Sequence, residues 1–128
     1  MSEIPHIRLD VLKEGLLIET INLNNRNIFK FGRGDQMNPT DTIQLLHESI
    51  SLFHAALAID KDQGLVMIDL GSETGTCLNG KRLEKNIPTP VQQQGDMITF
   101  GFSTRKYKVT VDYTRMLEAQ EQALKMLE

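Results

Sequence analysis

The chain has 128 residues, of which 40% are hydrophobic and 24% are charged, so it has the length and composition of one globular domain. No apolar run approaches the ~18 residues of a membrane-spanning helix, which excludes a helical membrane protein. The 14 basic and 17 acidic residues give a net charge of −3, which argues against direct binding of nucleic acid. Because Cys77 is the single cysteine and the N-terminus lacks an apolar secretory segment, we expect an intracellular protein.

Through residue 111, apolar residues alternate with polar ones or form short runs, as they do in β-strands. Turn residues separate these segments, such as Lys13-Glu14-Gly15 and Asn79-Gly80, the second of which suits a type I′ turn. Pro88 and Pro90 predict an extended segment or a sheet edge. The predicted strands, in chain order, cover residues 6–11, 16–23, 28–31, 42–46, 54–60, 65–70, 77–78, 81–83, 97–100 and 105–111.

Many short strands between turn residues favour an all-β fold, an antiparallel sandwich or barrel, over an α/β fold. Antiparallel pairs need only tight turns, whereas parallel pairs need long crossovers for which this chain lacks room. We therefore predict one β domain over residues 1–111.

Residues 112–128 predict a C-terminal helical extension, because they are rich in strong helix formers. Tyr113, Leu117, Leu124 and Leu127 fall on one stripe, with Met116 beside it. We favour a helix that packs this stripe on its own β domain. The alternative is the start of a helix or coiled coil that binds a partner.

The sequence gives little support for an enzyme. Ser51, His54 and Asp69 supply the residue types of a nucleophilic triad, but any chain of this size offers such a set. His6 and His47 do not stand at the spacing of metal ligands. We predict no catalytic residue, no metal site and no cofactor.

Four short segments form a more specific pattern through their order and spacing. They are Gly32-Arg33 at the end of a strand, Ser51-Leu52-Phe53-His54-Ala55, the loop from Asp69 to Thr76, and the segment from Gly95 to Gly101. Together they resemble the forkhead-associated (FHA) domain, a reader of phosphothreonine peptides. The resemblance covers residues 6–111 and implies a two-sheet antiparallel β-sandwich whose loops at one end hold the peptide.

A second resemblance lies in residues 100–107, which look like the last strands of a nuclear subgroup of this family. The subgroup includes the Smad nuclear-interacting protein, the nuclear inhibitor of protein phosphatase-1 and kanadaptin, and the first two are linked to pre-mRNA splicing. The resemblance implies a nuclear protein in a pre-mRNA-processing assembly.

The family resemblance also assigns the residues that contact a phosphopeptide. Arg33 and Ser51 match the phosphate contacts, since a guanidinium and a hydroxyl are donors that a phosphate dianion accepts. Leu52, Glu73 and Thr74 match positions that touch the phosphate and the peptide backbone beyond it.

Four further residues match supports of this site. Gly32 precedes the arginine, and His54 matches a histidine that hydrogen-bonds loop backbone and orders the site. Gly75 is expected to adopt a backbone angle that other residues resist, and Thr76 to tie the loop down.

Three of the contact positions depart from the family pattern. Leu52 offers no side-chain donor, and Thr74 lacks the two-donor amide that the family usually has there. A Glu73 carboxylate about 8 Å from a dianion would be repelled by roughly 1–4 kcal/mol. Two outcomes follow for Glu73: it points into solvent at little cost, or it pairs with Arg33 and blocks the site.

Two functional hypotheses therefore stand. In the first, a monomer binds a protein that contains phosphothreonine, without contacting nucleic acid or membrane. In the second, the site is degenerate and the domain is a phosphate-independent scaffold that acts through its sheet faces or the C-terminal helix.

Overall fold

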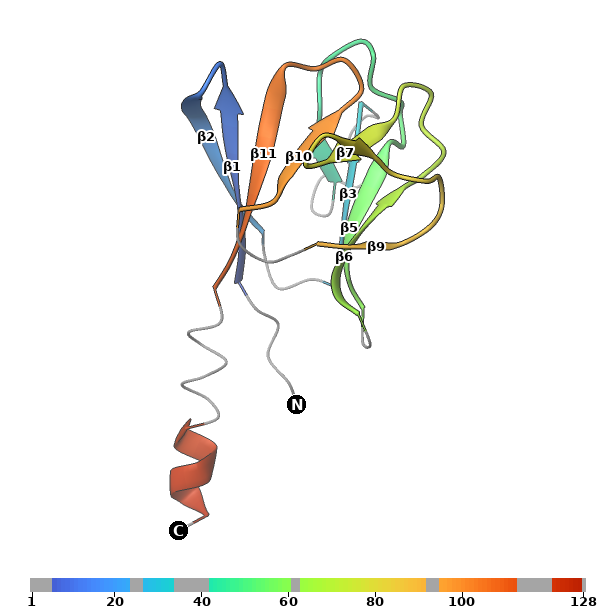
Figure 1. Ribbon diagram of the computed structural model, residues 1–128. Helices are drawn as coiled ribbons and strands as arrows, with labels where there is room; N and C mark the ends of the chain where they lie inside the picture. The colour runs from blue at the N-terminus through green and yellow to red at the C-terminus, as the bar shows by residue number, and fades with distance from the viewer. Residues whose placement is uncertain are drawn as a thin grey trace.

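The structure, a computed structural model, describes residues 6–23, 27–33, 42–60, 63–91, 95–112 and 121–127. Its strands follow one another along the chain with few other elements between them (Figure 1). Every strand predicted from the sequence is present, with ends within two residues of the prediction. The strands are β1 (His6–Lys13), β2 (Leu16–Leu23), β3 (Ile28–Gly32), β4 (Thr42–Gln44), β5 (Ala55–Asp60), β6 (Gly64–Asp69), β7 (Thr76–Leu78), β8 (Lys81–Arg82), β9 (Thr89–Pro90), β10 (Met97–Phe100) and β11 (Arg105–Asp112).

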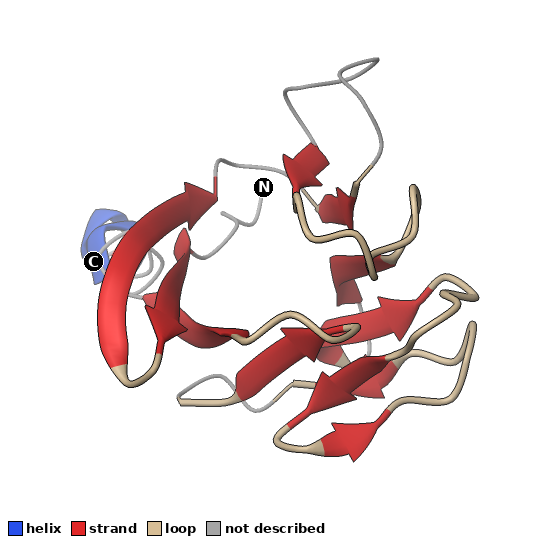
Figure 2. Cartoon of the chain, turned by 90° about the horizontal axis from the view of Figure 1, so that it is seen from above, coloured by secondary structure: helices blue, strands red, loops and turns tan. Residues whose placement is uncertain are grey.

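The strands form two sheets that face each other, as the view from above shows (Figure 2). One sheet has the order β2-β1-β11-β10-β7-β8, and the other has the order β4-β3-β5-β6-β9. The β-sandwich predicted from the sequence is confirmed. The short strand β9, which contains Pro90, lies at a sheet edge, where its missing N–H removes no ladder hydrogen bond.

One strand pair corrects the prediction that this chain lacks room for a parallel pairing. Strands β3 and β4 are parallel, with Lys30 opposite Thr42 and Gly32 opposite Gln44. The connection between them runs through residues 33–41 only. A connection this short suffices because β4 has three residues and lies at the edge of its sheet.

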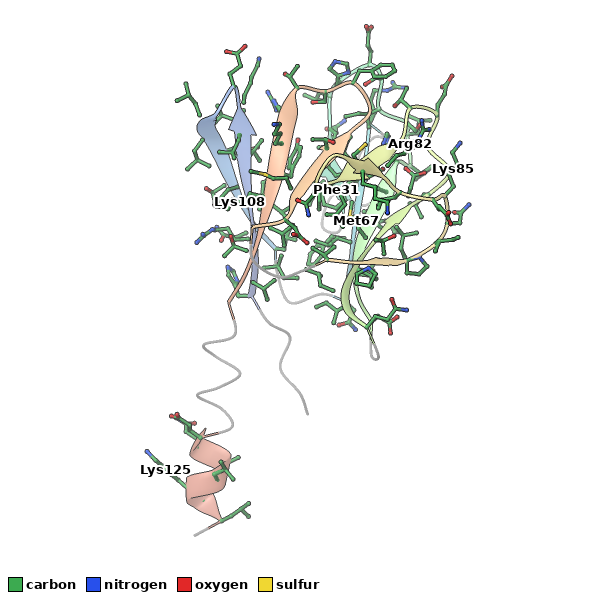
Figure 3. All side chains as sticks on the ribbon, in the orientation of Figure 1. Phe31, Met67, Arg82, Lys85, Lys108 and Lys125 are labelled. Atoms are coloured by element: carbon green, nitrogen blue, oxygen red, sulfur yellow. The ribbon has the colours of Figure 1, made fainter. Side chains whose placement is uncertain are left out.

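Alternation along the strands buries one side of each sheet. In β11, Tyr107, Val109 and Val111 are buried while Lys106 and Lys108 are exposed, as predicted. Phe31 of β3 and Met67 of β6, both labelled in Figure 3, are fully enclosed between the sheets.

Aromatic rings join the two sheets close to one end of this core. The ring centroid of Phe31 lies 5.0 Å from that of Phe100 on β10, and the Phe100 centroid lies 5.2 Å from that of Tyr107. Contacts of this kind add to the area that the rings bury. They make a rigid base beneath the loops of that end.

These loops are the turn between β1 and β2 and the connections that follow β4, β6 and β10, and they lie together at the top of Figure 1. We call this the apical end. Glu14 and Gly15, in the turn from β1 to β2, both have positive φ, and so do Asn79 and Gly80 between β7 and β8. These angles confirm the tight turn and the type I′ turn predicted from residue type.

The predicted C-terminal helix is present over residues 121–126, away from the sheets in Figure 1. Leu124 and Leu127 are 65% and 83% exposed, so the prediction that this end of the stripe packs on the β domain is wrong. The residues that begin the stripe, Tyr113, Met116 and Leu117, lie outside the described residues. In the part of the chain that the structure describes, no helix is long and apolar enough to cross a membrane.

Candidate functional site

An open pocket of about 340 Å³ lies among the apical loops, and we call it the apical pocket. It brings together four of the five residues predicted to contact a phosphopeptide, and the fifth, Leu52, is not among its lining residues. The pocket is lined by Arg33, Glu48, Ser49, Ile50, Ser51, Glu73, Thr74 and Phe102.

Arg33 follows β3 and is held by the backbone of the loop between β4 and β5. Its amide donates to the carbonyl of Ser51 at 2.9 Å, and its Nε donates to the carbonyl of Ile50 at 2.9 Å. These bonds fix the guanidinium, and among the described residues its two terminal amino groups remain donors that can serve a ligand in the pocket. Among the described residues Arg33 forms no ion pair, so the arrangement in which Glu73 pairs with it is not the one observed.

The Ser51 hydroxyl connects the two loops that flank the pocket. Its Oγ accepts a hydrogen bond of 3.1 Å from the backbone amide of Glu73. A hydroxyl that accepts in this way retains its own proton as a donor. The pocket therefore contains a positively charged donor and a neutral hydroxyl donor.

His54 is fully buried beneath these loops. Its Nδ1 accepts from the amide of Ser51 at 3.1 Å, and its Nε2 lies 2.7 Å from the carbonyl of Gly75. A ring that accepts at Nδ1 and donates at Nε2 is the neutral tautomer. His54 thus links the two loops, and its ring nitrogens bond to backbone groups rather than to the Ser51 hydroxyl or the Asp69 carboxylate, so these three residues do not form a nucleophilic triad.

The loop between β6 and β7 is organised around the buried carboxylate of Asp69. This carboxylate accepts hydrogen bonds from the amides of Gly71 and Ser72 at 3.1 and 3.0 Å. It also accepts from the hydroxyls of Ser72 and Thr76, each at 2.6 Å, so Thr76 ties the loop down. Burial alone would raise the pKa of Asp69, but the hydrogen bonds from Ser72 and Thr76 outweigh it and hold that pKa below its ordinary value.

Two glycines are required by close contacts at this end. A Cβ at Gly32 would lie 2.0 Å from the backbone oxygen of Leu52, so no side chain fits at this position. Gly75 has φ of +95°, and a Cβ there would lie 2.7 Å from Nε of Arg82. Figure 3 labels Arg82, which lies on β8.

The remaining predicted contact residues differ in their surroundings. Glu73 is exposed, and its amide rather than its carboxylate is engaged with Ser51. The Thr74 hydroxyl donates to the carbonyl of Ser49 at 2.5 Å. This bond joins two sides of the pocket wall and uses the hydroxyl proton within the protein. Leu52 is 53% exposed, with its backbone packed against Gly32.

A family model described as "FHA domain" matches residues 29–101, more than half of the chain. The chain belongs to the FHA family. Its relatives include the protein phosphatase 1 regulatory inhibitor subunit homolog of Arabidopsis thaliana, which is 37% identical over 77% of this chain and 26% of its own length. The nuclear inhibitor of protein phosphatase 1 of Homo sapiens is 35% identical over 80% of this chain and 28% of its own length. The chain thus spans about a quarter of these relatives.

Solved FHA structures share the fold. The FHA domain of TbPar42 matches 85% of this chain and 59% of its own chain, with a TM-score of 0.65 and 36% identity. A structure from an analysis of phosphothreonine-dependent FHA domain interactions matches 82% of this chain and 95% of its own, with a TM-score of 0.61. At 21% identity this second likeness shows the fold alone.

Sequence reasoning missed part of this FHA pocket. Glu48 and Phe102 line the pocket, and the carbonyl of Ile50 accepts a hydrogen bond from Arg33. The sequence motifs indicate neither the acidic residue in the pocket wall nor the position of this carbonyl. Ser49 also escaped notice, although its Oγ accepts from the amide of Phe102 at 2.8 Å and joins two loops. The nearest available signal was that residues 48–50 directly precede the motif that contains Ser51 and His54.

Proposed function

We propose that this chain is an FHA module that binds proteins containing phosphorylated threonine, with the phosphate in the apical pocket. The observation that supports this best is the convergence of Arg33 and Ser51 on one pocket, each with a donor that no described residue accepts. Among the described residues the Ser51 hydroxyl contacts a backbone amide and no general base, so Ser51 is arranged for binding rather than for turnover.

The chemistry of phosphothreonine fits these donors. Its phosphate has a charge of about −1.5 to −2 and three acceptor oxygens at neutral pH. A guanidinium offers paired N–H groups in a fixed plane, and hydrogen bonds between charged partners are about twice as strong as neutral ones. Arg33 would supply the charge-assisted bonds and Ser51 a further bond whose direction is set by the Glu73 amide. The methyl group of threonine would meet the apolar side chains of Ile50 and Phe102.

Relatives support a nuclear setting for this activity. One of them is named as a nuclear inhibitor of protein phosphatase 1, and the resemblance of residues 100–107 leads to the same subgroup. We extend the proposal to a nuclear assembly that processes pre-mRNA, in which this module acts as a monomer. We do not extend the proposal to inhibition of a phosphatase, because this chain matches about a quarter of the length of these relatives.

The proposal is tested by titrating the chain with matched peptide libraries that contain threonine or phosphothreonine at one fixed position. We expect binding of the phosphorylated library only. Equal binding of the two libraries would contradict the proposal. Because the second phosphate ionisation lies near ~6, the affinity is also expected to fall as the pH drops below that value.

A second candidate function is supported by the exposed apolar residues of the C-terminal helix. Leu124, Met126 and Leu127 are 65%, 86% and 83% exposed, which is typical of a surface that waits for a partner. In this alternative the domain is a phosphate-independent scaffold. If deletion of residues 113–128 leaves assembly with cellular partners unchanged while Arg33→Ala abolishes it, the scaffold function is excluded.

A further inference from the structure

A second pocket, of about 270 Å³, adjoins the apical pocket at the same end of the sandwich. We call it the basic pocket, because its lining includes Lys13, His47 and Arg105 and no carboxylate. Ile50 lines both pockets, and the segment Phe102–Ser103 passes from one to the other. Its two strong bases are the last residue of β1 and the first residue of β11, and these two strands lie next to each other in Figure 1.

The strand register explains how the two bases come together. In the pairing of β1 with β11, Leu9 lies opposite Val109 and Val11 lies opposite Tyr107, and all four side chains are buried. The next pair on this face is Lys13 opposite Arg105. The face that packs against the other sheet therefore ends, at the apical end, in two positive charges side by side.

The side chains of Lys13 and Arg105 are both exposed, so solvent screens the repulsion between them without removing it. Like charges directly opposite each other on neighbouring strands repel, and residues at this spacing contact one another. Among the described residues neither Lys13 nor Arg105 forms an ion pair with a carboxylate. Burial raises the pKa of the Tyr107 hydroxyl, and the charge of Arg105 beside it acts in the opposite direction. Two neighbouring cations without a carboxylate partner give the edge of this pocket a positive potential, which attracts an anion.

The two pockets also differ in charge. The apical pocket has one guanidinium and the carboxylates of Glu48 and Glu73, whereas the basic pocket has cations and the hydroxyls of Ser103 and Thr104. A second anionic group of a ligand would be repelled at the first pocket and attracted at the second.

We propose that the basic pocket binds a second anionic side chain of the same phosphopeptide, with Lys13 and Arg105 as its charged donors. This inference rests on the proposed binding of phosphothreonine in the apical pocket. The shared wall at Ile50 makes the two sites accessible to one short extended segment. The second anion is a phosphorylated residue or an Asp or Glu, since both present oxygen acceptors to the same donors.

The test uses fluorescence anisotropy with four peptides that share one phosphothreonine. At a second position they have alanine, glutamate, serine or phosphoserine. The spacing is varied over about two to five residues on either side, because an extended chain advances about 3.3 Å per residue. At the best spacing we expect the phosphoserine peptide to bind about tenfold more tightly than the serine peptide, as a hydrogen bond between charged partners allows.

Variants separate this inference from the proposed function. Lys13→Gln combined with Arg105→Gln is expected to abolish the gain and to leave the affinity for the alanine peptide within about twofold. The matched control is Lys106→Gln combined with Lys108→Gln, exposed bases of β11 on the opposite face, and it should retain the gain. Figure 3 labels Lys108. Arg33→Ala should abolish binding of all four peptides.

The possible outcomes distinguish the inference from the proposed function. A gain from both phosphoserine and glutamate supports a pocket for any anion, and a gain from phosphoserine alone supports a phosphate pocket. The inference is overturned if no spacing gives a gain, or if the gain survives in the Lys13 and Arg105 variant. In either case, binding of the alanine peptide still supports the proposed function. A fifth peptide is the alanine peptide without its phosphate. If the wild-type chain binds it as tightly as the phosphorylated alanine peptide, the proposed function is overturned, and this inference with it.

Discussion

The polar groups beneath the apical pocket and those that face it are used in opposite ways. Beneath the pocket, Asp69, Ser72, Thr76 and His54 bond to one another or to loop backbone, and no buried side-chain N or O atom of the described residues lacks a partner. Facing the pocket, the Arg33 side chain is held, among the described residues, through its Nε alone. The comparison separates groups that hold the loops from groups that remain available to a ligand.

The largest effect is expected from removing the charged donor. Arg33→Ala should weaken phosphopeptide binding by about 2–5 kcal/mol, because it removes one side of a desolvated charge pair. The stability of the fold should change little, since Arg33 is exposed. Isothermal titration and thermal denaturation measure the two quantities. Arg8→Ala is the matched control, because Arg8 lies on β1 in a surface ion pair with Asp10. Equal losses in both variants would contradict the assignment.

The opposite pattern is expected beneath the pocket. Asp69→Asn keeps the shape of the side chain but replaces an acceptor oxygen with an amide donor. This donor would face hydroxyls and amides that themselves donate to Asp69. It should lower the free energy of unfolding by about 2–4 kcal/mol, the range for several disrupted buried hydrogen bonds. Chemical denaturation measures it. Asp10→Asn, which affects a surface ion pair, should cost less than about 1 kcal/mol. A similar cost for both would mean that Asp69 does not organise the loop.

The same comparison shows what the sequence could and could not predict. The alternation of β11 and the Asn79-Gly80 turn encode structure over a few neighbouring residues, so local patterns located them. The parallel pairing of β3 with β4 depends on tertiary contacts and was missed. The stripe that ends in Leu124 and Leu127 correctly indicated a helix, but a stripe does not specify what it packs against.

Some residues of the site could also be predicted from the sequence, and others could not. Arg33, Ser51, Glu73 and Thr74 were placed together by the order of motifs, and the structure puts all four around one pocket. The acidity contributed by Glu48 could not be anticipated, because its position depends on how a loop folds. The basic pocket was missed for the same reason: Lys13 and Arg105 are 92 positions apart and become neighbours only through strand register.

A smaller effect is expected from pH. The folded pKa of Asp69 lies below its ordinary value of 3.8, so the ionised form is favoured by folding. The stability that this group contributes is therefore fully present above 3.8 and is lost as the pH falls through the lower, folded value. Denaturation at a series of acidic pH values should show the wild type and Asp69→Asn converging in this range. A difference that stays constant down to the most acidic pH would contradict the role of the charge.

The smallest effect is expected at Glu73. Glu73 lines the pocket and is exposed, so the repulsion between its carboxylate and a phosphate is screened. Glu73→Thr should tighten phosphopeptide binding by about two- to tenfold at low salt, with a smaller gain at high salt. Titration at two ionic strengths measures the change. An unchanged affinity at low salt would show that this carboxylate points away from the ligand.

The most direct measurement follows the nitrogen resonances of arginine side chains and backbone amides by NMR while a phosphothreonine peptide is added. We expect the terminal amino groups of Arg33 and the amides of Ser51 and Glu73 to shift together and to saturate at one stoichiometric equivalent. The unphosphorylated peptide should leave these resonances in place. Saturable shifts confined to the outer sheet faces or to residues 121–127, with Arg33 unmoved, would contradict the account.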